Sequence, residues 1–146
     1  MTQPTRRLAA VVLAAALLGG CGRDTPAAAD LCARYDDVKA AVQELEATPA
    51  LDTTNADAVQ EQVDALRLRA DKVRDTLDQV QRVSEGRLDT VIANARLSVD
   101  AMRESLIVAR YDAAETLGPK ITEAQANLRE AYAPVASALD TQCSTS

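Results

Sequence analysis

Residues 59–106 read VQEQVDALRLRADKVRDTLDQVQRVSEGRLDTVIANARLSVDAMRESL, and their apolar residues recur at alternating steps of four and three. This spacing places the apolar side chains on one face of an α-helix. The first apolar stripe comprises Val59, Val63, Leu66, Ala70, Val73, Leu77 and Val80, and the second comprises Leu88, Ile92, Ala95, Val99, Met102 and Leu106. Both stripes predict amphipathic helices that bury one face against other helices.

The two stripes are out of phase with each other around Gly86. Continuing the first stripe past Val80 leads to Ser84 and Arg87, whereas the second stripe starts at Leu88. Because glycine commonly ends helices, we predict a tight turn at Gly86, with the next helix starting near Arg87. The alternative is one continuous helix of about 60 residues, which at ~1.5 Å per residue would extend about 90 Å.

A further helix is predicted on the N-terminal side of this region. It runs from an Asp30 N-cap to Thr48-Pro49, since a proline disfavours helix in the residue before it. Its apolar stripe comprises Leu31, Tyr35, Val38, Val42 and Leu45. Thr54, three residues before Asp57, matches the capping pattern that begins the following helix.

A fourth helix is predicted at the C-terminal side. The stripe of the third helix continues through Ala109, Ala113 and Leu117. Gly118-Pro119 predicts the end of this helix, and Pro119 fits the first turn of the fourth. The stripe of the fourth helix comprises Ile121, Ala124, Leu128, Tyr132, Val135 and Leu139. Pro134 removes one helical hydrogen bond, so we expect a kink or an early break near Ala131.

Four amphipathic helices with short connections predict an all-α, antiparallel, up-down-up-down four-helix bundle over residues 30–146. That topology brings Cys32, in the first turn of the first helix, close to Cys143, just after the last. Outside the cytoplasm such a pair oxidises, and we expect a Cys32–Cys143 disulfide that clasps the bundle. The alternatives are two free buried thiols or an intermolecular bridge, and no C-x-x-C spacing indicates a redox-active pair.

The composition excludes several kinds of catalysis. The chain has no His, Phe or Trp, so His-based nucleophilic catalysis, His-ligated zinc and His-ligated haem have no ligands or bases. Beyond residue 22 its glycines, Gly86 and Gly118, stand alone, which excludes glycine-rich phosphate loops. We expect no enzyme activity and no cofactor.

Acidic and aromatic side chains are the remaining candidates for a metal site or a ligand pocket. A carboxylate-bridged metal site lacks the Glu-x-x-His pairs that it needs, and the acidic residues Asp36, Asp37, Asp71, Asp75 and Asp78 indicate solvated faces, so no metal is expected. The three tyrosines, Tyr35, Tyr111 and Tyr132, either line a ligand pocket or, as we expect for Tyr35 and Tyr132, pack beside the disulfide.

Four large apolar residues lie off the main stripes: Leu68, Leu97, Ile107 and Val108. One interpretation is that they widen the buried faces of the two middle helices, each of which touches two neighbours. The other is that they form an exposed patch for a partner protein or a second copy. The second interpretation is the best-motivated functional hypothesis that these residues support.

The N-terminus has the organisation of a secretory signal peptide over residues 1–20. Arg6 and Arg7 precede an uninterrupted apolar run from Leu8 to Leu18, which is too short to span a ~30 Å hydrocarbon core. Removing residues 1–20 reduces the 16 basic residues to 14 against 22 acidic ones, a net charge of −8. Such a charge disfavours nonspecific nucleic-acid binding and gives no polybasic attraction to anionic lipids.

Leu18, Gly19, Gly20 and Cys21 resemble the lipobox of bacterial lipoproteins. The resemblance implies that Cys21 receives a diacylglyceryl group, that the chain is cut before it, and that residues 21–29 tether the bundle to the outer face of the cell membrane. Acyl chains anchor a protein by apolar burial, at about 0.8 kcal/mol per CH₂. The alternative is an ordinary signal peptide with an incidental cysteine.

The lipobox, the short tether, an Ala-rich bundle and the terminal Cys143, with arginine preferred over lysine, are similar to small actinobacterial cell-envelope proteins of uncharacterised function. The resemblance carries over no catalytic residue. We therefore expect a membrane-anchored, non-enzymatic bundle that contacts an envelope protein. The alternative is a carrier that holds an acyl chain or another apolar ligand between its helices.

Overall fold

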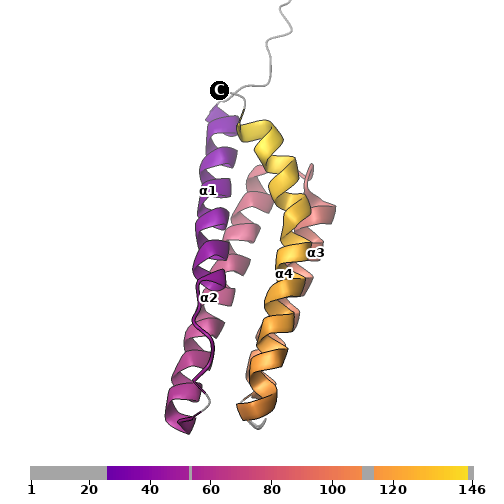
Figure 1. The fold of residues 1–146 in the computed structure, drawn as a ribbon. Helices are drawn as coiled ribbons and strands as arrows, with labels where there is room; N and C mark the ends of the chain where they lie inside the picture. The colour runs from indigo at the N-terminus through magenta and orange to yellow at the C-terminus, as the bar shows by residue number, and fades with distance from the viewer. Residues whose placement is uncertain (1–25, 53, 110–113, 145–146) are drawn as a thin grey trace, which may run out of the picture.

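The computed structural model describes residues 26–52, 54–109 and 114–144, and within them it is an all-α four-helix fold (Figure 1). The helices are α1 (Pro26–Glu46), α2 (Ala56–Val83), α3 (Asp89–Val108) and α4 (Ala114–Cys143). The predicted fold class is confirmed, and so is the disulfide that joins Cys32 to Cys143.

The core consists of the apolar stripes that the sequence predicts. The members of the first three stripes from Leu31 to Leu106 are buried, except for the half-buried Val59. In α4 the buried residues are Leu117, Ile121, Leu128, Val135, Leu139 and Cys143, with Ala124 and Tyr132 half-buried beside them. Four helical stripes thus meet in one continuous core.

Neighbouring helices run in opposite directions, as their contacts show. Between α1 and α2, Arg34 bonds Gln79 whereas Glu44 pairs with Lys72, so residue numbers fall in one helix as they rise in the other. Tyr35 of α1 bonds Asp140 of α4, at the end of the bundle where the indigo start of α1 lies beside the yellow end of α4 (Figure 1). The disulfide lies at this same end.

The predicted break at Gly86 is confirmed, and the single continuous helix is excluded. Helix α2 ends at Val83 and α3 begins at Asp89, with Glu85 at φ 52° and Gly86 at φ 82° between them. Two consecutive residues in the left-handed region reverse the chain in a short turn, and glycine adopts this region without steric cost.

Substitutions at the two adjacent positions of this turn should change the stability of the fold in opposite directions. Gly86→Ala forces a Cβ into the left-handed region and should destabilise the fold by about 1 kcal/mol, because that conformation costs an L-residue ~1–2 kcal/mol. Glu85→Gly relieves the same strain and should stabilise the fold by several tenths of a kcal/mol. Urea denaturation of both variants checks this, and equal signs would show that the turn is not held in this conformation.

The predicted starts of α1 and α2 differ from the structure. Helix α1 begins at Pro26, so residues 26–29 belong to the helix rather than to a tether, and Asp30 does not cap it. A proline at a helix start leaves no additional amide unpaired. Helix α2 is capped by Asn55, whose side chain accepts from the Asp57 amide, rather than by Thr54, which instead bonds Asp52.

Gly118-Pro119 does not separate α3 from α4, because both residues lie inside α4. Leu117 and Ile121 are both buried, and only a continuous helical phase places them on the same face. The usual clash of a proline ring with the preceding Cβ is absent at Gly118. The boundary therefore lies between Val108 and Ala114.

Pro134 does not end α4 either, since the helix continues to Cys143. The predicted early break near Ala131 is wrong. Figure 1 shows the yellow end of α4 inclined toward α1, and a bend is the usual result of a proline inside a helix. Burial of Val135 and Leu139 keeps the helix on the core beyond the proline.

Candidate functional site

The disulfide end of the bundle contains a polar cluster around the buried Tyr35. Cys32 and Cys143 are buried, with their Cα atoms 5.6 Å apart, and the Tyr35 hydroxyl donates to Asp140 Oδ1 at 2.7 Å. The Lys39 ammonium lies 4.4 Å from the centre of the Tyr35 ring. The packing interpretation of Tyr35 beside the disulfide agrees with these contacts, whereas Tyr111 lies outside the described residues.

Burial and the hydrogen bond to Asp140 raise the pKa of Tyr35 above its ordinary value. Burial also raises the pKa of Tyr132 to about 12, with the Tyr35 contact opposing this shift and the charge of Asp140 adding to it. Both hydroxyls therefore stay protonated at neutral pH. The cluster links α1 to α4 through the hydrogen bond from Tyr35 to Asp140.

These two tyrosines predict a loss of stability in alkali. Because their folded pKa values exceed the unfolded value of about 10, their contribution is complete below pH ~10 and is lost at higher pH, in the case of Tyr132 as the pH rises through about 12. Tyr35→Phe should destabilise the fold by about 1 kcal/mol at pH 7, since the exposed Asp140 regains water. The difference from wild type should shrink above pH 10 in pH-dependent denaturation, and a constant difference would contradict the shifted pKa.

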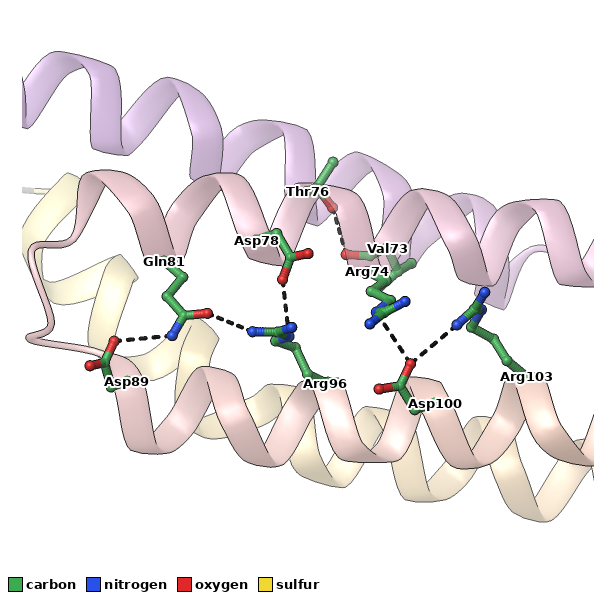
Figure 2. A network of polar contacts seen from close by, with 9 residues as sticks. All are labelled: Val73, Arg74, Thr76, Asp78, Gln81, Asp89, Arg96, Asp100 and Arg103. Carbon is green, nitrogen blue, oxygen red and sulfur yellow. Dashed lines mark hydrogen bonds and ion pairs between the residues drawn. The ribbon is translucent and has the colours of Figure 1, made fainter.

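The seam between α2 and α3 is a ladder of arginine and aspartate side chains (Figure 2). Arg96 Nε lies 3.0 Å from Asp78 Oδ1, and Arg74 and Arg103 each lie 3.3 Å from Asp100 Oδ1. Gln81 accepts from Arg96 at 2.8 Å and donates to Asp89 at 3.3 Å. The Arg103–Asp100 contact lies within α3, whereas the Arg96–Asp78 and Arg74–Asp100 pairs join the two helices and match the register in which they pack.

This ladder corrects the expectation of solvated acidic faces for Asp71 and Asp78. Asp78 pairs with Arg96, and Asp71 pairs with Arg103 across the seam. The sequence signal for these pairs is the set of arginines in the third helix, which lie opposite the two aspartates once the residues of α2 and α3 are written antiparallel to each other. The arginines and aspartates that join α2 to α3 face one another as opposite charges, which links the two helices.

Metal and membrane-spanning features are absent from the described ranges. These ranges hold no group of three or more cysteine, aspartate or glutamate side chains placed to share a metal ion. Nor does any helix within them combine the length and apolar content that a membrane crossing requires. The lipobox residues Leu18, Gly19, Gly20 and Cys21 lie outside the described residues.

The four off-stripe apolar residues are exposed, which excludes the interpretation that they merely widen the packing faces. Leu68 is 72% exposed, Leu97 68%, Ile107 48% and Val108 49%. The structure divides them between two helices. Leu68 lines a groove between α1 and α2, whereas the other three lie on α3.

A second groove, between α3 and α4, was not predicted from the sequence. It has a volume of about 580 Å³ and is lined by Val108 together with small side chains of both helices. Small residues spaced along α3, such as Ala101 and Ser105, are the sequence signal that indicates it.

Comparison with known proteins supplies no family for this arrangement: no protein-family model, curated protein or solved structure matches the chain.

Proposed function

We propose that this protein is a lipid-anchored protein of the extracytoplasmic membrane face that acts through protein–protein contacts, without catalysis. The observation that carries the proposal is the exposure of large apolar side chains on α2 and α3, with Leu68 and Leu97 about 70% exposed. Leaving such side chains in water forgoes ~1.5–3 kcal/mol each, which a partner recovers by covering them.

The arrangement of the helices supports a contact surface held away from the membrane. The proposed lipid at Cys21 precedes the start of α1 at Pro26, and this start lies at the disulfide end. Helix α3 has 20 residues and spans about 30 Å, ending at Val108, at the opposite end of the bundle from the turn at Gly86. Ile107 and Val108 therefore stand at the membrane-distal end.

The carrier hypothesis has no observation in its favour among the described residues. An acyl chain needs an apolar interior space, whereas the facing stripes fill the centre of the bundle with side chains that are almost all under 7% exposed. The hollows between helices are surface grooves with polar and charged residues in their linings.

Site-specific photo-crosslinking in native cells tests the contact surface. A photoreactive residue at position 97 or 108 of the full chain should yield one discrete adduct, because a specific partner covers these positions. The same residue at Glu61, which is exposed on α2, serves as the matched control. No adduct at 97 or 108, or identical adducts at 61, would contradict a specific contact surface.

The anchor is tested separately by mass spectrometry of the mature N-terminus. We expect a lipid-modified Cys21 in the membrane fraction, and a Cys21→Ala variant that is neither lipidated nor membrane-bound. An unmodified Cys21 in a released protein would overturn the anchor and leave the contact surface untouched.

A further inference from the structure

Helix α3 has a second helical face that the bundle does not cover. Leu97, Ala101, Ser105 and Val108 follow one another at steps of four, four and three, which places them along one line of the helix. All four are exposed, whereas the opposite line from Ile92 to Leu106 is buried. An apolar or small residue at each step of an exposed line is typical of a helix that packs on both sides.

Three residues of this face, Ala101, Ser105 and Val108, line the groove between α3 and α4, whereas Leu97 lies outside its lining. The small lining residues of the groove are Ser98, Ala101, Ser105 and Ala124, over the buried Met102. Short side chains let the backbone of another helix approach closely, at the 8–10 Å axis separation of packed helices. The shape therefore fits a helix better than an extended strand or a compact ligand.

The two walls of the groove carry negative charge. Glu104 lies on the α3 wall and Glu123 on the α4 wall, both are exposed, and neither forms an ion pair within the described residues. Lys120, the cation of the lining, is already engaged in an interaction of its own. A helix in the groove would place its flanks against the two glutamates.

We infer that the α3–α4 groove binds an amphipathic helix of another protein, with small or apolar residues on its contact face and Lys or Arg on both flanks. This inference rests on the proposed protein-contact function and specifies the chemistry of the partner. A second copy of this chain is a poorer occupant, because its own exposed stripe on α3 is flanked by Glu104 and would bring glutamate against glutamate. Anionic lipid headgroups meet the same repulsion.

The test measures binding of a defined probe to the full chain. The probe is a labelled synthetic helix with an Ala/Leu contact face and Lys flanks, and its matched form carries Glu in place of Lys. Fluorescence anisotropy should show binding of the Lys form and at least tenfold weaker binding of the Glu form, since only the first complements the walls.

Charge-reversal variants locate the binding site. Glu104→Lys with Glu123→Lys should weaken binding of the Lys probe at least tenfold. The control, Glu61→Lys with Asp75→Lys, makes the same change in net charge at exposed positions of α2 and should leave the dissociation constant within twofold. Ala101→Gln, which fills the exposed groove without a charge, should also weaken binding about tenfold.

Three outcomes would overturn the inference. Equal weakening by both charge-reversal pairs would show nonspecific attraction to an acidic protein. Equal binding of the Lys and Glu probes would exclude the walls as the determinant. A dimer in sedimentation that Ala101→Gln dissociates would identify a second copy as the occupant. Adducts from positions 97 and 108 together with any of these results would leave the proposed function standing and refute only the helix-binding groove.

Discussion

Replacing both bridge cysteines, Cys32→Ala with Cys143→Ala, should lower the thermal midpoint by about 10–20 °C. The bridge closes a loop across a sequence separation of 111 residues, and in the chain-entropy model a ~100-residue loop is worth about 4.7 kcal/mol. For a domain of this size, each kcal/mol shifts the midpoint by roughly 3–5 °C. Replacing both residues avoids leaving a free thiol that would react.

The position of the bridge between α1 and α4 is a second reason to expect a large loss of stability. It joins α1 to α4, whose other contacts include the Tyr35–Asp140 hydrogen bond and the exposed Arg129–Glu46 pair at 2.8 Å. Exposed ion pairs contribute ~0–1 kcal/mol, so the covalent bond is the strongest link across this seam.

Calorimetry with and without a reductant provides the control. The reductant should lower the midpoint of the wild type to that of the double variant and leave the variant unchanged. If the oxidised wild type and the variant unfold at the same temperature, the bridge contributes nothing to stability.

Leu77→Ala and Leu68→Ala should differ in their cost to stability by about 1.5 kcal/mol or more, although both replace a leucine of α2. Leu77 is 0% exposed, so its truncation leaves a cavity in the core and costs about 2–5 kcal/mol. Leu68 is 72% exposed, and its truncation should change the stability by less than about 0.5 kcal/mol.

The pair also separates stability from function. Leu68→Ala retains the fold and removes apolar surface from the α1–α2 groove, so any loss of partner binding in this variant reports on contact. Urea denaturation of the two variants side by side gives the comparison. Equal costs would show that the helical phase of α2 differs from the one described.

Two predicted helix boundaries, of which one is confirmed and the other is wrong, illustrate which sequence signals are reliable. The turn at Gly86 was predicted from a glycine together with a slip in the apolar phase, and both signals agree with the structure. At Gly118-Pro119 the breaker residues stood alone while the apolar phase from Leu117 to Ile121 continued unbroken, and the helix continues there. Burial of a stripe outweighs one missing backbone hydrogen bond.

The exposed residues Leu68, Leu97, Ile107 and Val108 were identifiable as off-stripe positions, but their separation onto two surfaces was not. A sequence shows which side of its own helix a residue occupies and not which neighbouring helix lies beside that side. The groove between α3 and α4 depends on how two helices 20 and 30 residues long are placed together, and this is why it was missed.

The local pattern of this sequence is sufficient to specify four amphipathic helices, their buried faces and a Cys32–Cys143 bridge, because each follows from periodicity and short connections. The register of α2 against α3 emerges only in three dimensions, where Arg74, Arg96 and Arg103 meet aspartates of the other helix that lie 18 to 32 positions away along the chain. Periodicity depends on residues within a few turns of each other, whereas pairing across a seam depends on the relative position of two helices, which packing sets.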